Sequence, residues 1–75
     1  MKHFYCIKLI GQDVYFDIQP DPNNPEESVV VKVDWPVLFE LVGYAQRVHR
    51  NVLKIQPDAK LVSAMVTIVE HVIHH

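Results

Sequence analysis

The stretch 58–73, DAKLVSAMVTIVEHVI, decides how the rest of the chain is interpreted. On a helical wheel at about 100° per residue, its polar side chains share one arc and its apolar side chains fill roughly 200°. Arranged as a strand, the same residues would mix polar and apolar side chains on one face. We therefore expect a helix beginning at Asp58 as N-cap, although the β-branched composition leans toward a strand.

The apolar arc of this stretch is about twice as wide as a helix lying on a single core needs. A chain of 75 residues also has a marginal core unless metals, disulfides or partners add to it. An intrachain disulfide is excluded because Cys6 is the only cysteine. We therefore predict a homodimer, with an interface formed by His49, Met65, Val66, Val69, Val72 and Ile73.

A preceding helix is predicted over residues 35–55. Asp34 is its expected N-cap, and Pro36 is tolerated in a first helical turn. Gly43 lowers the stability of this helix by about 1 kcal/mol relative to alanine. It marks either a kink or a close contact. Gln56-Pro57 separates this helix from the next one.

The first half of the chain predicts three strands, at about residues 3–10, 14–19 and 28–33. A turn at Gly11 joins the first two strands. The segment 20–27 is predicted to be a loop because its three prolines and two asparagines oppose regular pairing. The expected fold is a single α+β domain over residues 1–75. It has a three-stranded antiparallel meander followed by two helices (β-β-β-α-α), which pack on one sheet face.

The charge distribution points to one candidate binding surface. The net charge of −2 gives no general affinity for nucleic-acid backbones. Arg47, Arg50 and Lys54 nevertheless follow the spacing i, i+3, i+7, which lines them along one helix face. Either this face is simply solvated, or it contacts acidic protein or phosphates. Phe39 and Tyr44 lie at the edges of the polar arc, and these five residues are the predicted partner-binding set.

The histidines give no cofactor prediction. His49 lies within the apolar arc of the first helix, where it is either a core or boundary histidine with a hydrogen-bond partner or a polar contact at a subunit interface. In the second case, association would depend on pH. His71, His74 and His75 lack a carboxylate or cysteine at metal-ligand spacing, so we predict no metal site. No catalytic residue, nucleotide motif or cofactor is predicted, and we expect no enzyme.

The favoured function is therefore a small protein-binding module of the inhibitor, antitoxin or immunity type, or a phage-encoded factor, which acts by occupying the surface of a partner protein. One alternative is a dimeric strand-helix-helix DNA-binding regulator. Another is a structural subunit of a larger assembly. The lone thiol suits a reducing compartment, and the charged 58–73 stretch argues against a membrane span, so we expect a cytoplasmic protein.

Overall fold

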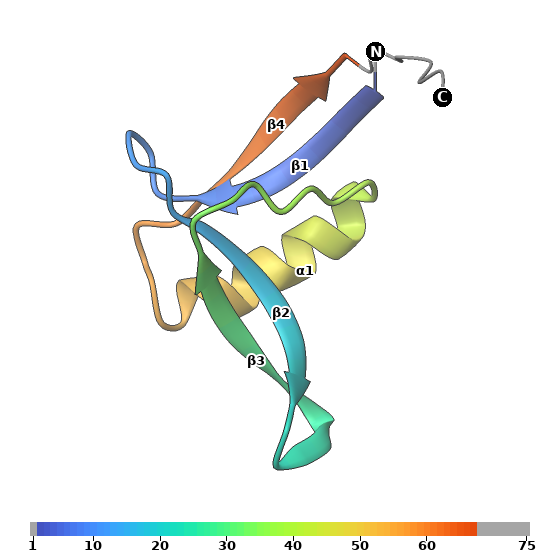
Figure 1. Ribbon diagram of the computed structural model, residues 1–75, viewed down its shortest axis with the longest axis vertical. Coiled ribbons are helices and arrows are strands. Elements are labelled where there is room, and N and C mark those ends of the chain that lie inside the picture. The colour runs from blue at the N-terminus through green and yellow to red at the C-terminus, as the bar shows by residue number, and fades with distance from the viewer. Residues whose placement is uncertain (1, 68–75) are drawn as a thin grey trace, which may run out of the picture.

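The computed structural model describes residues 2–67 and shows one antiparallel sheet with a helix on one face (Figure 1). The elements in chain order are β1 (Lys2–Lys8), β2 (Tyr15–Asp21), β3 (Asn24–Val33), α1 (Val42–Leu53) and β4 (Lys60–Val66). The strands lie in the order β3-β2-β1-β4, so α1 carries the chain from one edge of the sheet to the other. The order of elements is therefore β-β-β-α-β.

The turn between β1 and β2 is closed by main-chain hydrogen bonds. The Leu9 amide donates to the Val14 carbonyl at 3.1 Å, and the Gln12 amide donates to the Leu9 carbonyl at 3.2 Å. Gly11 has a φ of 78°, in the left-handed region that glycine adopts without steric cost. The glycine therefore permits the reversal that starts the sheet.

The sheet divides into two arms that diverge from the β1–β2 turn (Figure 1). β1 pairs with β4 along its whole length, from Lys2 opposite Val66 to Lys8 opposite Lys60, but with β2 only where Lys8 meets Tyr15. Farther along β1, Phe39 takes the place of β2, because Tyr5 and Phe39 exchange two main-chain hydrogen bonds of 2.8 Å. The segment before α1 thus provides hydrogen-bond partners for main-chain groups of β1 that β2 does not reach.

The core lies between α1 and the sheet face that it covers. Ala45, Val48 and Val52 follow the i, i+3, i+7 spacing of one helix face, and all three are buried. They pack in one cluster with Ile7, Phe16, Phe39 and Ala59, and half-buried neighbours complete this cluster: Tyr5, Leu9, Val14, Ile18, Val30, Val37 and Leu61.

The predicted second helix is wrong, and with it the β-β-β-α-α order. The described part of 58–73 forms β4, in which Leu61 and Val62 lie on opposite faces and are both half-buried. A strand that is covered on both faces does not alternate between apolar and polar residues. Its sequence can therefore be mistaken for that of a helix with a wide apolar face. The antiparallel partner β1 lies in register with all seven residues of β4 and forms the hydrogen-bonded ladder that holds this strand. The domain nevertheless remains α+β.

The bounds of the other elements also differ from the prediction. The first helix spans only Val42–Leu53, with Leu41 as N-cap and no side-chain cap, because the residues around Phe39 are extended along β1. The predicted 20–27 loop is largely strand. Pro20 pairs with Ser28, and the register shifts between Pro20 and Asp21. Proline is tolerated there because the register is irregular and because β1 pairs with β2 only at Tyr15, far from Pro20.

Candidate functional site

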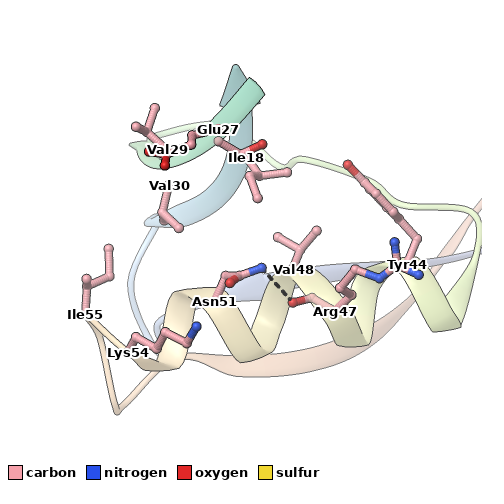
Figure 2. A pocket seen from close by; sticks show the side chains of 11 residues that line it. Ile18, Glu27, Val29, Val30, Tyr44, Arg47, Val48, Asn51, Lys54 and Ile55 are labelled. Atoms are coloured by element: carbon pink, nitrogen blue, oxygen red, sulfur yellow. Dashed lines mark hydrogen bonds between the residues drawn. The ribbon is translucent and has the colours of Figure 1, made fainter. Parts of the chain in front are cut away.

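A groove of about 780 Å³ separates the exposed side of α1 from the β2–β3 hairpin (Figure 2). It lies in the angle between the helix and the arm of the sheet that diverges from it. Figure 2 shows Val48 rising from the helix toward the hairpin, with Val30 pointing down from β3. The residues that line the groove are Ile18, Glu27, Ser28, Val29, Val30, Tyr44, Arg47, Val48, Asn51, Lys54 and Ile55.

The helix wall of the groove combines one buried apolar side chain with a polar rim. Val48 is buried, whereas Arg47 and Lys54 are exposed. The Asn51 side-chain amide donates to the Arg47 carbonyl at 3.2 Å, which holds Asn51 against its own helix (Figure 2). The spacing i, i+4, i+7 of Arg47, Asn51 and Lys54 places their side chains in one row along the groove.

The walls of the groove carry opposite charges. Arg47 and Lys54 lie on the helix wall, and Glu27 lies on the β3 wall. Within residues 2–67, the one ion pair joins Lys2 to Glu40, with 3.9 Å between Nζ and Oε1, so neither Arg47 nor Lys54 is neutralised by a described carboxylate. A ligand in the groove would therefore meet two uncompensated cations on one side and a carboxylate on the other.

The five predicted partner-binding residues are only partly brought together. Arg47, Lys54 and Tyr44 line the groove, whereas Arg50 is exposed but does not line it. Phe39 is 8% exposed and belongs to the core, so it offers little surface to a partner. The ring centroids of Phe39 and Tyr44 are 5.6 Å apart, with an interplanar angle of 59°. Phe39 therefore packs against the groove residue Tyr44.

His49 has an internal hydrogen-bond partner. Its Nε2 atom lies 2.9 Å from the carbonyl oxygen of Ala59, just before β4, and its side chain is half-buried. A carbonyl only accepts, so Nε2 carries the proton and donates it. Of the two interpretations of His49, the histidine with a hydrogen-bond partner inside the chain is the one that the contacts fit.

The dimer interface was predicted on a second helix, and the structure has the strand β4 in its place. Met65 and Val66 lie in β4, where Met65 is exposed and Val66 is half-buried. Val69, Val72 and Ile73 lie outside the described residues, as do His71, His74 and His75. Within residues 2–67, no three or more His, Cys, Asp or Glu side chains are grouped so as to hold a metal ion.

Cys6 has a shielded thiol. Its side chain is 5% exposed on the sheet face opposite α1. Burial raises the pKa of the Cys6 thiol above its ordinary value, and the positive charge of Lys8 offsets only part of this effect. A thiol that is buried and protonated is a poor nucleophile, so Cys6 is a structural residue.

The sequence prediction missed the strand side of the groove. Ile18 and Val30 were assigned to strands, but nothing in their local pattern indicates that the β2–β3 arm diverges from the helix. Ile55, at the end of the helix, is exposed although it is apolar. This apolar residue beside Lys54 is the one feature of the sequence that hints at a binding surface, but a single exposed apolar residue does not define a groove.

Comparisons with protein-family models, with curated proteins and with solved structures found no match to this chain. Its function must therefore be inferred from its own residues.

Proposed function

We propose that this chain is a small, non-enzymatic protein-binding module whose groove between α1 and the β2–β3 hairpin receives a segment of a partner protein. The observation that supports the proposal is the groove itself, with its apolar interior and its charged rims. The segment would carry apolar side chains for the interior and carboxylates toward Arg47 and Lys54. Small inhibitors, antitoxins, immunity proteins and phage-encoded factors act in this way, by occupying a surface of their target.

The apolar interior provides the binding free energy. Ile18, Val30 and Ile55 offer aliphatic surface to an incoming side chain, and a Leu- or Phe-sized anchor gains about 1.5–3 kcal/mol when it leaves water. Tyr44 and Arg47 are of the residue types that dominate binding energy at protein interfaces. The same contacts would serve a structural subunit of a larger assembly, which is a second form of the proposal.

The charges on the two walls fix the orientation of the segment. Carboxylates are attracted to the helix wall by Arg47 and Lys54 and repelled from the β3 wall by Glu27. Arg50, one turn away on the same helix, adds to the long-range attraction without lining the groove. Rim charges of this kind act mainly on the association rate and on its salt dependence.

A DNA-binding regulator is the weaker candidate. The strand-helix-helix arrangement on which it was based is absent from residues 2–67, because the second helix is replaced by β4. The net charge of −2 also opposes a general affinity for phosphate backbones. Binding to mixed duplex DNA that falls steeply between about 50 and about 200 mM salt would favour the regulator and contradict the groove proposal.

The proposed location of the module is the cytoplasm, where a lone thiol stays reduced. No helix within residues 2–67 has the length and apolar character needed to cross a bilayer.

Site-specific photocrosslinking in the native cell tests the groove. Tyr44 is replaced by photoreactive benzoylphenylalanine, and Trp35 is replaced in the matched control. Trp35 is an exposed aromatic residue that does not line the groove. We expect one partner protein to be captured from position 44 and not from position 35. Arg47→Glu with Lys54→Glu should strongly reduce the capture, because the charge attraction that speeds association becomes repulsion.

Three results would count against the proposal. The first is capture of the same proteins from both positions, or of none from position 44. The second is a capture whose yield both charge reversals leave unchanged. The third is a crosslink from position 44 only to a second copy of the chain, which would assign the groove to self-association.

A further inference from the structure

The two edges of the sheet differ in how they are protected. The β3 edge carries Pro25, Glu26 and Glu27, and its pairing with β2 is irregular between Pro20 and Asp21. Proline, charge and bulges are the devices by which natural edge strands avoid pairing with other chains. The hairpin end of the β3 edge is therefore protected against pairing with a further strand.

The β4 edge is less protected than the β3 edge. β4 contains no proline or glycine, its only charge is Lys60 at its first position, and its register with β1 is uninterrupted. Within residues 2–67, no strand lies on the outer side of β4. A regular strand of this kind offers a row of main-chain donors and acceptors that another strand satisfies best.

We propose that β4 pairs antiparallel with β4 of a second copy about a two-fold axis at Ser63. This interface joins two four-stranded sheets into one continuous sheet and places both α1 helices on the same face. It is independent of the groove, because no β4 residue lines the groove.

The sequence of β4 is what points to a second copy as the partner. A two-fold axis at Ser63 places Leu61 opposite Met65, Val62 opposite Ala64 and Lys60 opposite Val66. Apolar side chains then meet on both faces. The two Lys60 residues lie about 20 Å apart along the strands, beyond the screening length at physiological salt.

A parallel arrangement is disfavoured by the same residues. It would bring the two Lys60 ammonium groups side by side, and like charges next to each other oppose strand pairing. The antiparallel arrangement also accounts for Met65. This residue is 63% exposed in the single chain, and the Leu61 side chain of the second copy would cover it.

Analytical ultracentrifugation of three proteins tests the interface: the unaltered chain, Met65→Lys and Ile10→Lys. Ile10 is the matched control because it is also 63% exposed but lies in the turn after β1, away from the β4 edge. At about 100 µM we expect the unaltered chain and Ile10→Lys to be dimers. Met65→Lys should weaken the dimer at least about tenfold, because a lysine is introduced next to the apolar strand of the partner.

A monomeric unaltered chain at this concentration would overturn the proposal, as would equal dimerisation of Met65→Lys and the unaltered chain. Circular dichroism of each variant verifies that the fold is retained.

The register is tested by disulfide formation in a Cys6→Ser background. Ser63→Cys should oxidise to a covalent dimer, because residues opposite each other on adjacent strands lie within the Cα separation of a disulfide. Ser28→Cys, on the β3 edge next to Glu26 and Glu27, is the matched control and should remain monomeric. Equal crosslinking at both positions, or none at either, would contradict pairing through β4.

Discussion

The imidazole of His49 donates a 2.9 Å hydrogen bond to the carbonyl of Ala59, and this contact fastens α1 to the start of β4. Ala59 is buried, so its carbonyl would have no comparable partner without the histidine. The contact joins two residues ten positions apart across the turn that contains Pro57. Together with the 3.1 Å hydrogen bond from the Ala59 amide to the Gln56 carbonyl, it holds the turn between the helix and the edge strand.

Removal of this hydrogen bond should destabilise the fold. We expect His49→Ala to lower the free energy of unfolding by about 1–3 kcal/mol, because a buried acceptor is left without its donor. His49→Gln retains an N–H donor and should restore part of the loss. Arg50→Ala, an exposed neighbour on the same helix, should stay within about 0.5 kcal/mol of the unaltered chain. Urea unfolding measures all three, and a neutral His49→Ala would show that the contact contributes nothing.

Replacement of each of the two glycines by alanine should change the stability of the fold in opposite directions. Gly11→Ala should destabilise by about 1 kcal/mol, because the φ of 78° brings a Cβ close to the following carbonyl. Gly43 lies in the first turn of α1 with open space around it, so of the two alternatives, a kink or a close contact, the close contact is absent. Gly43→Ala should therefore stabilise by about 0.4–1 kcal/mol. Thermal unfolding compares the two, and the same sign for both would contradict the turn and helix assignments.

The Cys6 thiol predicts a stability that falls in alkaline solution. Its pKa is raised in the folded state, so the folded chain binds this proton more tightly than the unfolded chain does. Ionisation of the thiol leaves stability unchanged at pH values below the ordinary pKa of a cysteine, and stability declines as the pH rises from there toward the raised pKa of the folded chain. Cys6→Ala should remove this part of the decline. Urea unfolding at a series of pH values measures it, and identical profiles for both proteins would contradict the burial of the thiol.

The parts of the fold that the sequence predicts are those with a clear local pattern. Val14, Phe16 and Ile18 alternate with polar residues, and this predicted β2. The apolar spacing of Ala45, Val48 and Val52 predicted the central part of α1. Gly11 marked the turn between β1 and β2. In each case, the local preference and the tertiary environment agree.

The parts that were wrong are decided by contacts distant in sequence. Asp34 and Pro36 form a good helix start, but the chain stays extended to reach the hydrogen bonds between Phe39 and Tyr5. The 58–73 stretch separates cleanly on a helical wheel, yet its described part becomes a strand because β1 offers an uncovered edge. Its β-branched residues were the signal for a strand.

The candidate site was predictable only on its helix side. The row that contains Arg47 and Lys54 follows from helical spacing, and both residues line the groove. The opposite wall depends on the angle between the β2–β3 hairpin and α1, which no local pattern specifies. Ile18 and Val30 could not be assigned to the groove until that angle was known.

The central claim is that residues 60–66 form a strand beside β1, and a cross-strand disulfide tests it most directly. His3 lies opposite Met65 and both side chains are exposed, so His3→Cys with Met65→Cys in a Cys6→Ser background should form an intrachain disulfide upon mild oxidation. His3→Cys with Ala64→Cys in the same background is the matched control, because Ala64 faces the other side of the sheet and both thiols should stay free. Mass spectrometry after thiol labelling reads the result. A disulfide in the His3→Cys, Met65→Cys variant alone is predicted, and free thiols in both variants, or equal oxidation of both, would contradict the strand.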